Sequence, residues 1–118
     1  MKTALLFVLL LSCLRCHASD WSDSDKIRES VILTTLAIDY AQTRDIKNYN
    51  MAFEHNPLLG SHPSDGRIKG YFIVSAIAHV LIADQLAPKY REYLQNGTIA
   101  IELVAIGKNK RMGLHLKF

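Results

Sequence analysis

The sequence predicts an all-α fold, a small bundle of three membrane-associated helices that follow an N-terminal signal. Three observations lead to this expectation. Apolar residues recur at helical spacing in three segments, turn pairs built on proline and glycine separate these segments, and a basic residue near the N-terminus precedes an apolar run. The chain has 118 residues. Roughly 100 remain after the signal, which is enough for one domain.

Residues 1–18 have the three parts of a secretory signal. Lys2 supplies the positive charge, Thr3 to Leu11 forms the apolar run, and small residues follow. Cleavage after Cys16-His17-Ala18 leaves a single helical domain of residues 19–118. The protein is therefore expected to be exported, to the cell membrane or to the periplasmic face of the envelope.

Two alternatives to this cleavage stay open. Leu10-Leu11-Ser12-Cys13 resembles a bacterial lipobox, in which Cys13 becomes the lipidated N-terminus of a lipoprotein. The signal could also be an uncleaved anchor, although its apolar run is short of the roughly 20 residues that span a bilayer.

Charge and cysteine usage exclude several classes of function. The chain has 14 Lys+Arg against 11 Asp+Glu, and removal of Lys2 and Arg15 with the signal reduces the basic count to 14 − 2 = 12. A nearly neutral mature chain argues against a nucleic-acid partner. Both cysteines, Cys13 and Cys16, lie in the signal region, so no disulfide, thiol nucleophile or cysteine zinc site is expected after cleavage.

The first predicted helix runs from about Asp25 to Lys47. Ser22 and Asp25 are spaced as a capping box at its start, and Ser24 is a second N-cap candidate. The apolar side of this helix consists of Ile27, Val31, Ile32, Leu36 and Ile38.

Turn pairs fill the loop from Asn48 to Gly66, and the second helix follows from about Arg67 to Leu86. Pro88 suits the first turn of a third helix, Pro88 to Lys108, which breaks at Asn96-Gly97 in an alternative interpretation. The last residues, Met112 to Phe118, alternate in polarity like an outer-membrane barrel strand. The helical spacing upstream argues against a barrel.

Charge asymmetry favours three membrane crossings. With an exported N-terminus, the cytoplasmic segments carry eight basic residues and the outer segments carry four, which fits the positive-inside rule. The cytoplasmic set is Arg44, Lys47, Arg67, Lys69, Lys108, Lys110, Arg111 and Lys117, and the outer set is Lys26, Arg28, Lys89 and Arg91. By hydropathy alone only the second helix approaches spanning length, so a soluble or peripherally bound helical domain stays open as the rival.

Each predicted helix carries one ionisable residue near its middle: Asp39, His79 and Glu102. Gln42 shares the helical stripe of Asp39. Three converging helices would gather these groups in a core of low dielectric constant, where they could relay protons or bind a cation, including a divalent metal. In the structural alternative, which we prefer, they satisfy one another and hold the helices in register. No metal and no cofactor is assigned.

The loop before the second helix concentrates further polar side chains, including Glu54, His55 and Asn56. Metal binding or catalysis is one interpretation. In the preferred alternative Pro57, Gly60 and Pro63 shape a rigid connection and Ser64 caps the second helix, with Glu54 and Asn56 as the exceptions. The sequence contains no H-E-x-x-H or G-x-S-x-G motif, and its one C-x-x-C, Cys13-Leu14-Arg15-Cys16, lies in the signal region, so enzymatic activity is not favoured.

Two motifs carry a resemblance that covers about residues 21–118. Asp39-x-x-Gln42-Thr43 is followed by Glu54-x-Asn56-Pro57-x-Leu59-Gly60-x-His62-Pro63-Ser64. The chain resembles a group of small, uncharacterised bacterial and phage membrane proteins or lipoproteins, which implies a helical membrane protein of bacterial or phage origin and implies no activity. Members of the group tend to have an aromatic residue where Asn96-Gly97 stands, and this departure puts the regularity of the third helix in doubt.

The expected function is that of a small cell-envelope membrane protein with a structural or binding role, as an accessory component. The first alternative is a membrane-embedded enzyme or proton- or ion-handling protein that uses the carboxylate–histidine cluster. The second is a soluble periplasmic lipoprotein domain. The membrane is the expected partner, and because three short helices bury little surface, self-association or an envelope protein partner is expected as well.

Overall fold

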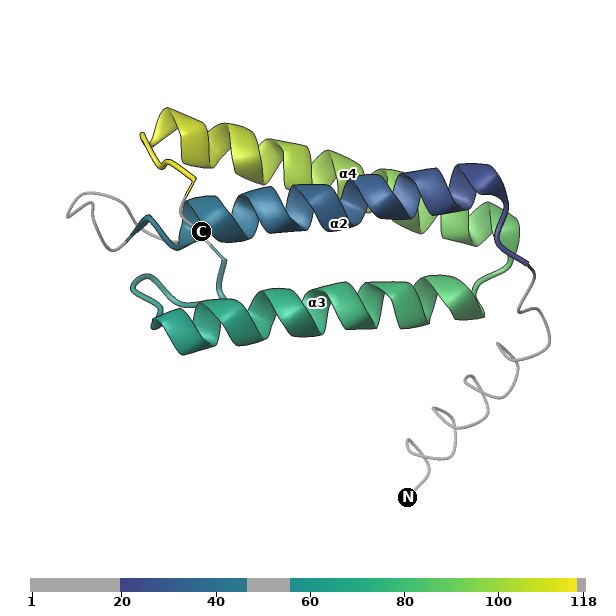
Figure 1. Cartoon of the computed structure of the whole chain (residues 1–118), viewed down its shortest axis with the longest axis horizontal. Helices are drawn as coiled ribbons and strands as arrows, with labels where there is room; N and C mark the ends of the chain where they lie inside the picture. Colours follow the sequence, from purple (N-terminus) through teal and green to yellow (C-terminus); the bar gives the residue numbers. More distant parts are fainter. Residues whose placement is uncertain (1–19, 47–55, 117–118) are drawn as a thin grey trace, which may run out of the picture.

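The computed structural model describes residues 20–46 and 56–116, which form three long helices (Figure 1). These are α2 (Asp23–Thr43), α3 (Asp65–Gln85) and α4 (Pro88–Arg111). The described residues contain helices, turns and irregular segments and no strand, which confirms the predicted all-α fold of three helices. The predicted signal at residues 1–18, with Cys13, and the predicted site residue Glu54 lie outside the described residues.

Helix α2 begins with the predicted capping box. The Ser22 hydroxyl accepts from the Asp25 amide at 3.1 Å, and the Asp25 carboxylate accepts from the Ser22 amide at 3.0 Å. The helix ends at Thr43 rather than at Lys47, and Arg44 and Asp45 form a turn. The predicted helix was therefore too long. In the turn that follows α2, the Asp45 carboxylate accepts from the amide of His115 at 2.8 Å, a contact 70 residues away that local spacing does not reveal.

Helices α3 and α4 both differ from prediction at their ends. Ser64 caps α3 as expected, accepting from the Arg67 amide at 3.2 Å, and α3 begins at Asp65. Helix α4 continues to Arg111 and passes through Asn96-Gly97 without a break, because the inward side chains on either side of this pair are packed into the bundle. The predicted alternation after Met112 forms no strand within the described residues, which end at Leu116.

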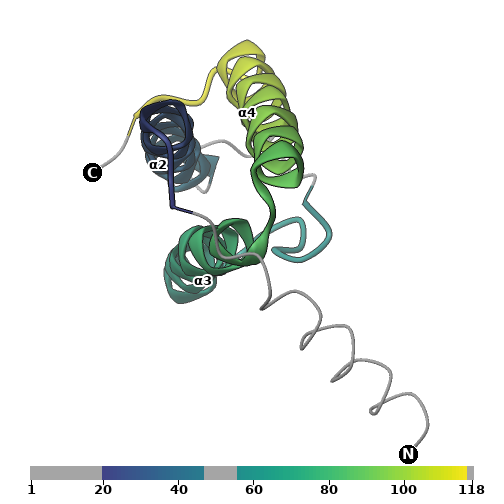
Figure 2. The ribbon, with the colours of Figure 1, turned by 90° about the vertical axis from the view of Figure 1, so that its right-hand side faces the viewer.

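The three helices lie at the corners of a triangle when seen along the bundle (Figure 2). Helices α2 and α4 run in the same direction and α3 runs opposite to them. Helix α2 packs most closely against α4, and the contact between α3 and α4 is the smallest of the three. We call the end where α2 and α4 begin the N-terminal end of the bundle, and the other the opposite end.

The apolar core is small and lies toward the opposite end. Its aromatic centre is Phe72, whose ring centroid lies 5.7 Å from that of Tyr40 and 5.1 Å from that of Tyr71. The buried members of this cluster are Ile32, Leu36, Leu59, Ile68 and Phe72. Leu59 connects the loop after Asn56 to the helices.

Polar residues are as common as hydrophobic ones in the interior. Among the described residues, nine hydrophobic and nine polar or charged residues are buried. The polar set is Asp25, Glu29, Thr35, Gln42, Thr43, Asp45, Arg91, Gln95 and Asn109. This departs from the usual distribution, in which charged residues are almost never fully buried.

The outer surface has the complementary composition. On α2 from Ile27 to Ala37, on α3 from Gly70 to Ile82 and on α4 from Tyr93 to Gly107, each exposed residue is uncharged. Large apolar side chains are exposed in this band, and Ile77 is 57% exposed at mid-α3. We call these exposed residues the uncharged belt. Lys26 and Glu92 border it at the N-terminal end, and Lys69 and Lys108 border it at the opposite end.

Among the described residues, α3 alone is both long and apolar enough to cross a membrane on its own composition. Within the described structure, 17% of its apolar window is buried.

Candidate functional site

Arg91 is the most deeply buried charged residue described, with no exposed surface. Its guanidinium donates to the carbonyl oxygens of Ala83 at 2.8 Å and Leu86 at 3.1 Å, and to the Asp25 carboxylate at 3.1 Å. It also lies 4.8 Å from the centre of the Trp21 ring. Arg91 thereby joins the start of α2, the end of α3 and the start of α4.

Asp25 is the anionic partner of two arginines. Arg28 donates to its other carboxylate oxygen at 2.6 Å. Burial alone would raise the pKa of Asp25, but hydrogen bonds from Ser22, Arg91 and Arg28 outweigh that effect and hold the pKa below its usual value. Asp25 therefore stays ionised, and Arg91 has a compensating charge inside the bundle.

Gln95 extends this group of contacts toward the middle of the bundle. Its amide nitrogen donates to Glu29 Oε2 at 2.9 Å and to the Asp25 carbonyl at 3.0 Å, and its oxygen accepts from Arg28 Nε at 2.9 Å. The Gln95 side chain, fully buried, thus has both amide hydrogens and its oxygen engaged.

His79 lies between Glu29 and Thr98. Its Nδ1 is 2.8 Å from Glu29 Oε1 and its Nε2 is 3.1 Å from Thr98 Oγ1. The Thr98 hydroxyl donates its one hydrogen to the Leu94 carbonyl at 2.9 Å, so it accepts from His79 Nε2.

These contacts form one continuous group, which we call the Arg91 network: Asp25, Arg28, Glu29, His79, Arg91, Gln95 and Thr98. Of its members, the sequence predicted only His79 as a site residue. The sequence shows a polar stripe of Thr98, Glu102 and Asn109 on α4, and the missed signal is that Gln95 and Arg91 continue this stripe toward the start of the helix, at intervals of three and four residues.

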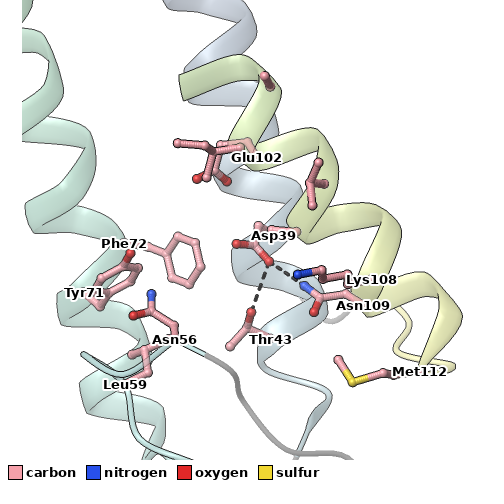
Figure 3. Close-up of a pocket in the computed structure, with 14 residues that line it drawn as sticks. Asp39, Thr43, Asn56, Leu59, Tyr71, Phe72, Glu102, Lys108, Asn109 and Met112 are labelled. Carbon is pink, nitrogen blue, oxygen red and sulfur yellow. Dashed lines mark hydrogen bonds between the residues drawn. The ribbon is translucent and has the colours of Figure 1, made fainter. Parts of the chain in front are cut away.

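The second polar group lies toward the opposite end, in a pocket of about 480 Å³ between α3 and α4 with α2 behind it (Figure 3). We call it the Asp39 pocket. Its polar lining residues are Asp39, Thr43, Asn56, Glu102, Lys108 and Asn109. Apolar and aromatic side chains, among them Leu59, Tyr71 and Phe72, form much of the remaining wall.

Asp39 and Glu102, two of the predicted site residues, meet in this pocket. Asp39 Oδ1 accepts from the Thr43 hydroxyl at 3.3 Å and from the Asn109 amide. Glu102 Oε2 is shielded from solvent and has no hydrogen-bond partner among the described residues. His79 is not part of the pocket lining and contacts Glu29 and Thr98 in the Arg91 network, so the predicted cluster of three ionisable residues is corrected to the pair Asp39 and Glu102.

Two more predicted site residues are Gln42, which is buried, and Asn56, which lines the pocket. Gln42 is buried, and its Oε1 also has no hydrogen-bond partner among the described residues. Asn56 lines the pocket while its side-chain oxygen accepts from the Leu58 amide at 3.0 Å. Arg67 donates twice to the Leu58 carbonyl, at 3.2 and 2.9 Å, and so holds this loop against the start of α3.

Comparisons with protein-family models, with curated proteins and with solved structures gave no match. Function must therefore be argued from the two polar groups themselves. The Arg91 network is a continuous set of hydrogen bonds between α2, α3 and α4, suited to holding three helices together. The Asp39 pocket combines open volume with an unpartnered acceptor, so it is the place where a ligand could bind.

Proposed function

We propose that this protein is a small integral membrane protein of the cell envelope, in which all three helices cross the bilayer. Its role is structural or binding, as an accessory component. The helices contain 21, 21 and 24 residues. At about 1.5 Å per residue they measure roughly 32–36 Å, comparable with a hydrocarbon core of about 30 Å.

One observation carries this proposal: charged side chains lie inside the bundle and the belt around it is uncharged. A water-soluble bundle of this size depends on apolar burial, which is modest here. In a bilayer, by contrast, the belt faces acyl chains, and polar groups must turn inward and satisfy one another. The Arg91 network has the form that this environment requires.

The same arrangement explains why, among the described helices, α3 alone is apolar enough in composition to be identified as a membrane span. Buried charges such as Glu29 and Arg91 lower the mean hydropathy of α2 and α4, although these side chains do not face outward. Tyr90 and Tyr93, each 61% exposed at the N-terminal end, suit the interface between lipid and water. Lys26, Lys69 and Lys108, at the borders of the belt, can extend their ammonium groups to that interface.

A charge placed in the belt tests the proposal. Ile77→Lys puts an ammonium at the middle of the lipid-facing surface of α3, where insertion costs about 2.5–3.5 kcal/mol. We expect Ile77→Lys to lower the amount of chain retained in the membrane pellet after alkaline carbonate washing. Ser61→Lys, exposed in the loop before α3, is the matched control and should be retained like the parent chain.

The soluble lipoprotein alternative makes the opposite prediction. A soluble bundle gains from a lysine at an exposed apolar position, so Ile77→Lys would fold and be more soluble than the parent. In addition, Cys13→Ala would release a soluble domain from the membrane in the carbonate wash. Release of Cys13→Ala together with tolerance of Ile77→Lys would contradict the membrane-spanning proposal.

A second candidate function is the handling of protons or ions. It is favoured by the polar side chains that follow one another along the bundle, from Asp25 through His79 and Thr98 to Glu102 and Asn109. Proton flux into liposomes that contain the purified protein tests this candidate. Flux that His79→Gln abolishes without loss of the helical circular dichroism signal would support it, and absence of flux from the parent protein would reject it.

Self-association, or association with an envelope protein, completes the proposal. The contact between α3 and α4 is small, and large apolar side chains remain exposed on both helices. We expect the purified protein in detergent to have a mass greater than one chain when measured by light scattering. A stable single chain over a range of detergent concentrations would count against self-association.

A further inference from the structure

We propose that the Asp39 pocket binds an organic ammonium cation that carries an apolar arm, that is, an amphiphilic primary amine. This inference rests on the proposed function in one respect, because the apolar arm would reach the pocket from the bilayer. The cationic group itself is inferred from the two carboxyl groups in the pocket lining and from the unpartnered oxygen of Glu102.

The pocket contains more acidic than basic side chains. Asp39 and Glu102 both line it, and Lys108 is the one basic residue in its described lining. Glu102 Oε2 is hidden from solvent and accepts no hydrogen bond from the described residues, so it lacks the partner that a buried carboxylate oxygen requires. A ligand with a positively charged N–H donor would supply that partner.

The pocket wall also suits an ammonium group. The rings of Tyr71 and Phe72 both contribute to it, and aromatic faces attract ammonium cations by cation–π interaction. A volume of about 480 Å³ lies within the range of small-molecule binding sites and exceeds what a single inorganic ion needs.

The apolar arm of the ligand can leave the pocket past residues that belong both to the pocket wall and to the uncharged belt. Ile101 and Val104 line the pocket and also lie in the uncharged belt, with 69% and 57% of their surfaces exposed. The pocket is therefore continuous with the apolar outer surface beside α4. A ligand can place its cation near Glu102 and extend its chain along Ile101 and Val104.

A metal ion fits the pocket less well than an organic cation. Within residues 20–46 and 56–116, no three His, Cys, Asp or Glu side chains gather to hold a metal. Asp39 Oδ1 already accepts two hydrogen bonds, and much of the pocket wall offers carbon rather than oxygen. A divalent cation requires more oxygen ligands than this arrangement provides.

The test compares two probes that share a chain and differ in their head group. The full-length protein is placed in phosphatidylcholine nanodiscs, which contain no primary amine, and is titrated with n-octylamine or n-octanol at neutral pH. We expect octylamine to bind and to raise the melting temperature, and octanol to do neither beyond its effect on empty nanodiscs.

Variants assign the binding to the pocket. Glu102→Gln keeps the shape of the side chain and removes its charge, so octylamine affinity should fall at least about tenfold. Glu92→Gln, on the exposed side of the same helix, is the matched control and should bind like the parent. Ala105→Leu keeps every charge and fills part of the pocket, and it should also weaken binding.

Three outcomes would overturn the ligand proposal: equal binding of octanol and octylamine, unchanged octylamine affinity in Glu102→Gln, or failure of the parent to bind either probe above empty nanodiscs. The carbonate wash separates this from the proposed function. A chain that stays in the membrane without preferring the amine contradicts the ligand alone. A chain that is washed out yet prefers octylamine contradicts the membrane proposal alone.

Discussion

Arg91 illustrates how one side chain organises the N-terminal end of the bundle. Its planar guanidinium makes separate hydrogen bonds to the Asp25 carboxylate and to the carbonyl oxygens of Ala83 and Leu86, where α3 ends. A lysine ammonium is compact and cannot reproduce this spread of donors. Arg91 therefore supplies both the charge that Asp25 needs and the donors that the end of α3 needs.

Replacement of Arg91 should strongly destabilise the folded protein. Arg91→Ala leaves the Asp25 charge inside the bundle without its buried partner, and losing one partner of a buried pair costs about 3–5 kcal/mol. We expect a large fall in the melting temperature of Arg91→Ala, measured by circular dichroism in detergent. The melting temperature of Arg91→Lys should lie between those of Arg91→Ala and the parent. Arg111→Ala, at the exposed end of α4, is the control. Equal melting temperatures for Arg91→Ala and Arg111→Ala would show that the network does not stabilise the fold.

Asp25 gives the network a predictable response to acid. It lies before the uncharged belt, and its pKa is lowered in the folded protein despite burial. Its stabilising contribution is therefore complete above the unfolded pKa of about 4 and is lost as the pH falls through the lower folded value. Between neutral pH and about pH 3, the parent should lose more stability than Asp25→Asn.

The matched control for this acid response is Asp23→Asn, in the same helical turn, where the side chain is 96% exposed. Its melting temperature should fall with pH as steeply as that of the parent. If Asp25→Asn and Asp23→Asn gave the same pH dependence, the hydrogen bonds to Asp25 would not be the source of the acid sensitivity.

At the scale of the helices, the glycines at positions 97 and 60 provide opposite tests. A Cβ atom at Gly97 would meet nothing within 4 Å, and α4 is helical there. Gly97→Ala should therefore stabilise the protein by about 0.5–1 kcal/mol. Gly60 has a φ of +79°, in the left-handed region, so Gly60→Ala should cost about 1–2 kcal/mol. Melting temperatures measure both, and a destabilising Gly97→Ala would indicate that the outer face of α4 contacts a partner closely.

The helices were largely predictable because their boundaries are encoded locally. Ser22, Ser64 and Pro88 stand at the positions that helix starts require, and the structure uses all three. The end of α2 was not predictable, since it depends on a hydrogen bond from His115 to Asp45. The start of a helix can therefore be predicted from local sequence more readily than an end that involves a distant contact.

The candidate site was predictable only in part. Asp39 and Glu102 stood out because each is an ionisable residue in an apolar stretch, and both line the pocket. Glu29 did not, because Lys26, Arg28 and Glu29 together resemble an ordinary solvated helical turn. Its partners Gln95 and His79 lie 66 and 50 residues away. With apolar residues on most sides of each helix, spacing alone does not reveal which side faces inward.

At the scale of the whole molecule, the two ends of the bundle differ in charge. The N-terminal end carries Asp20, Asp23 and Glu92, and two of its arginines are engaged by Asp25. The opposite end carries an excess of basic residues: Arg44, Arg67, Lys69, Lys108, Lys110 and Arg111. By the positive-inside rule, a three-crossing protein with this distribution has its opposite end in the cytoplasm.

Single cysteines at the two ends test this orientation. Ser24→Cys lies in the exposed first turn of α2, and Lys110→Cys lies in the exposed last turn of α4. We expect a membrane-impermeant maleimide to label Ser24→Cys in intact spheroplasts, and to label Lys110→Cys only after the membrane is permeabilised. The parent chain measures the background from Cys13 and Cys16. Labelling of both positions in intact spheroplasts would place the whole bundle outside the bilayer, because only a membrane between the two ends can protect one thiol and leave the other reactive.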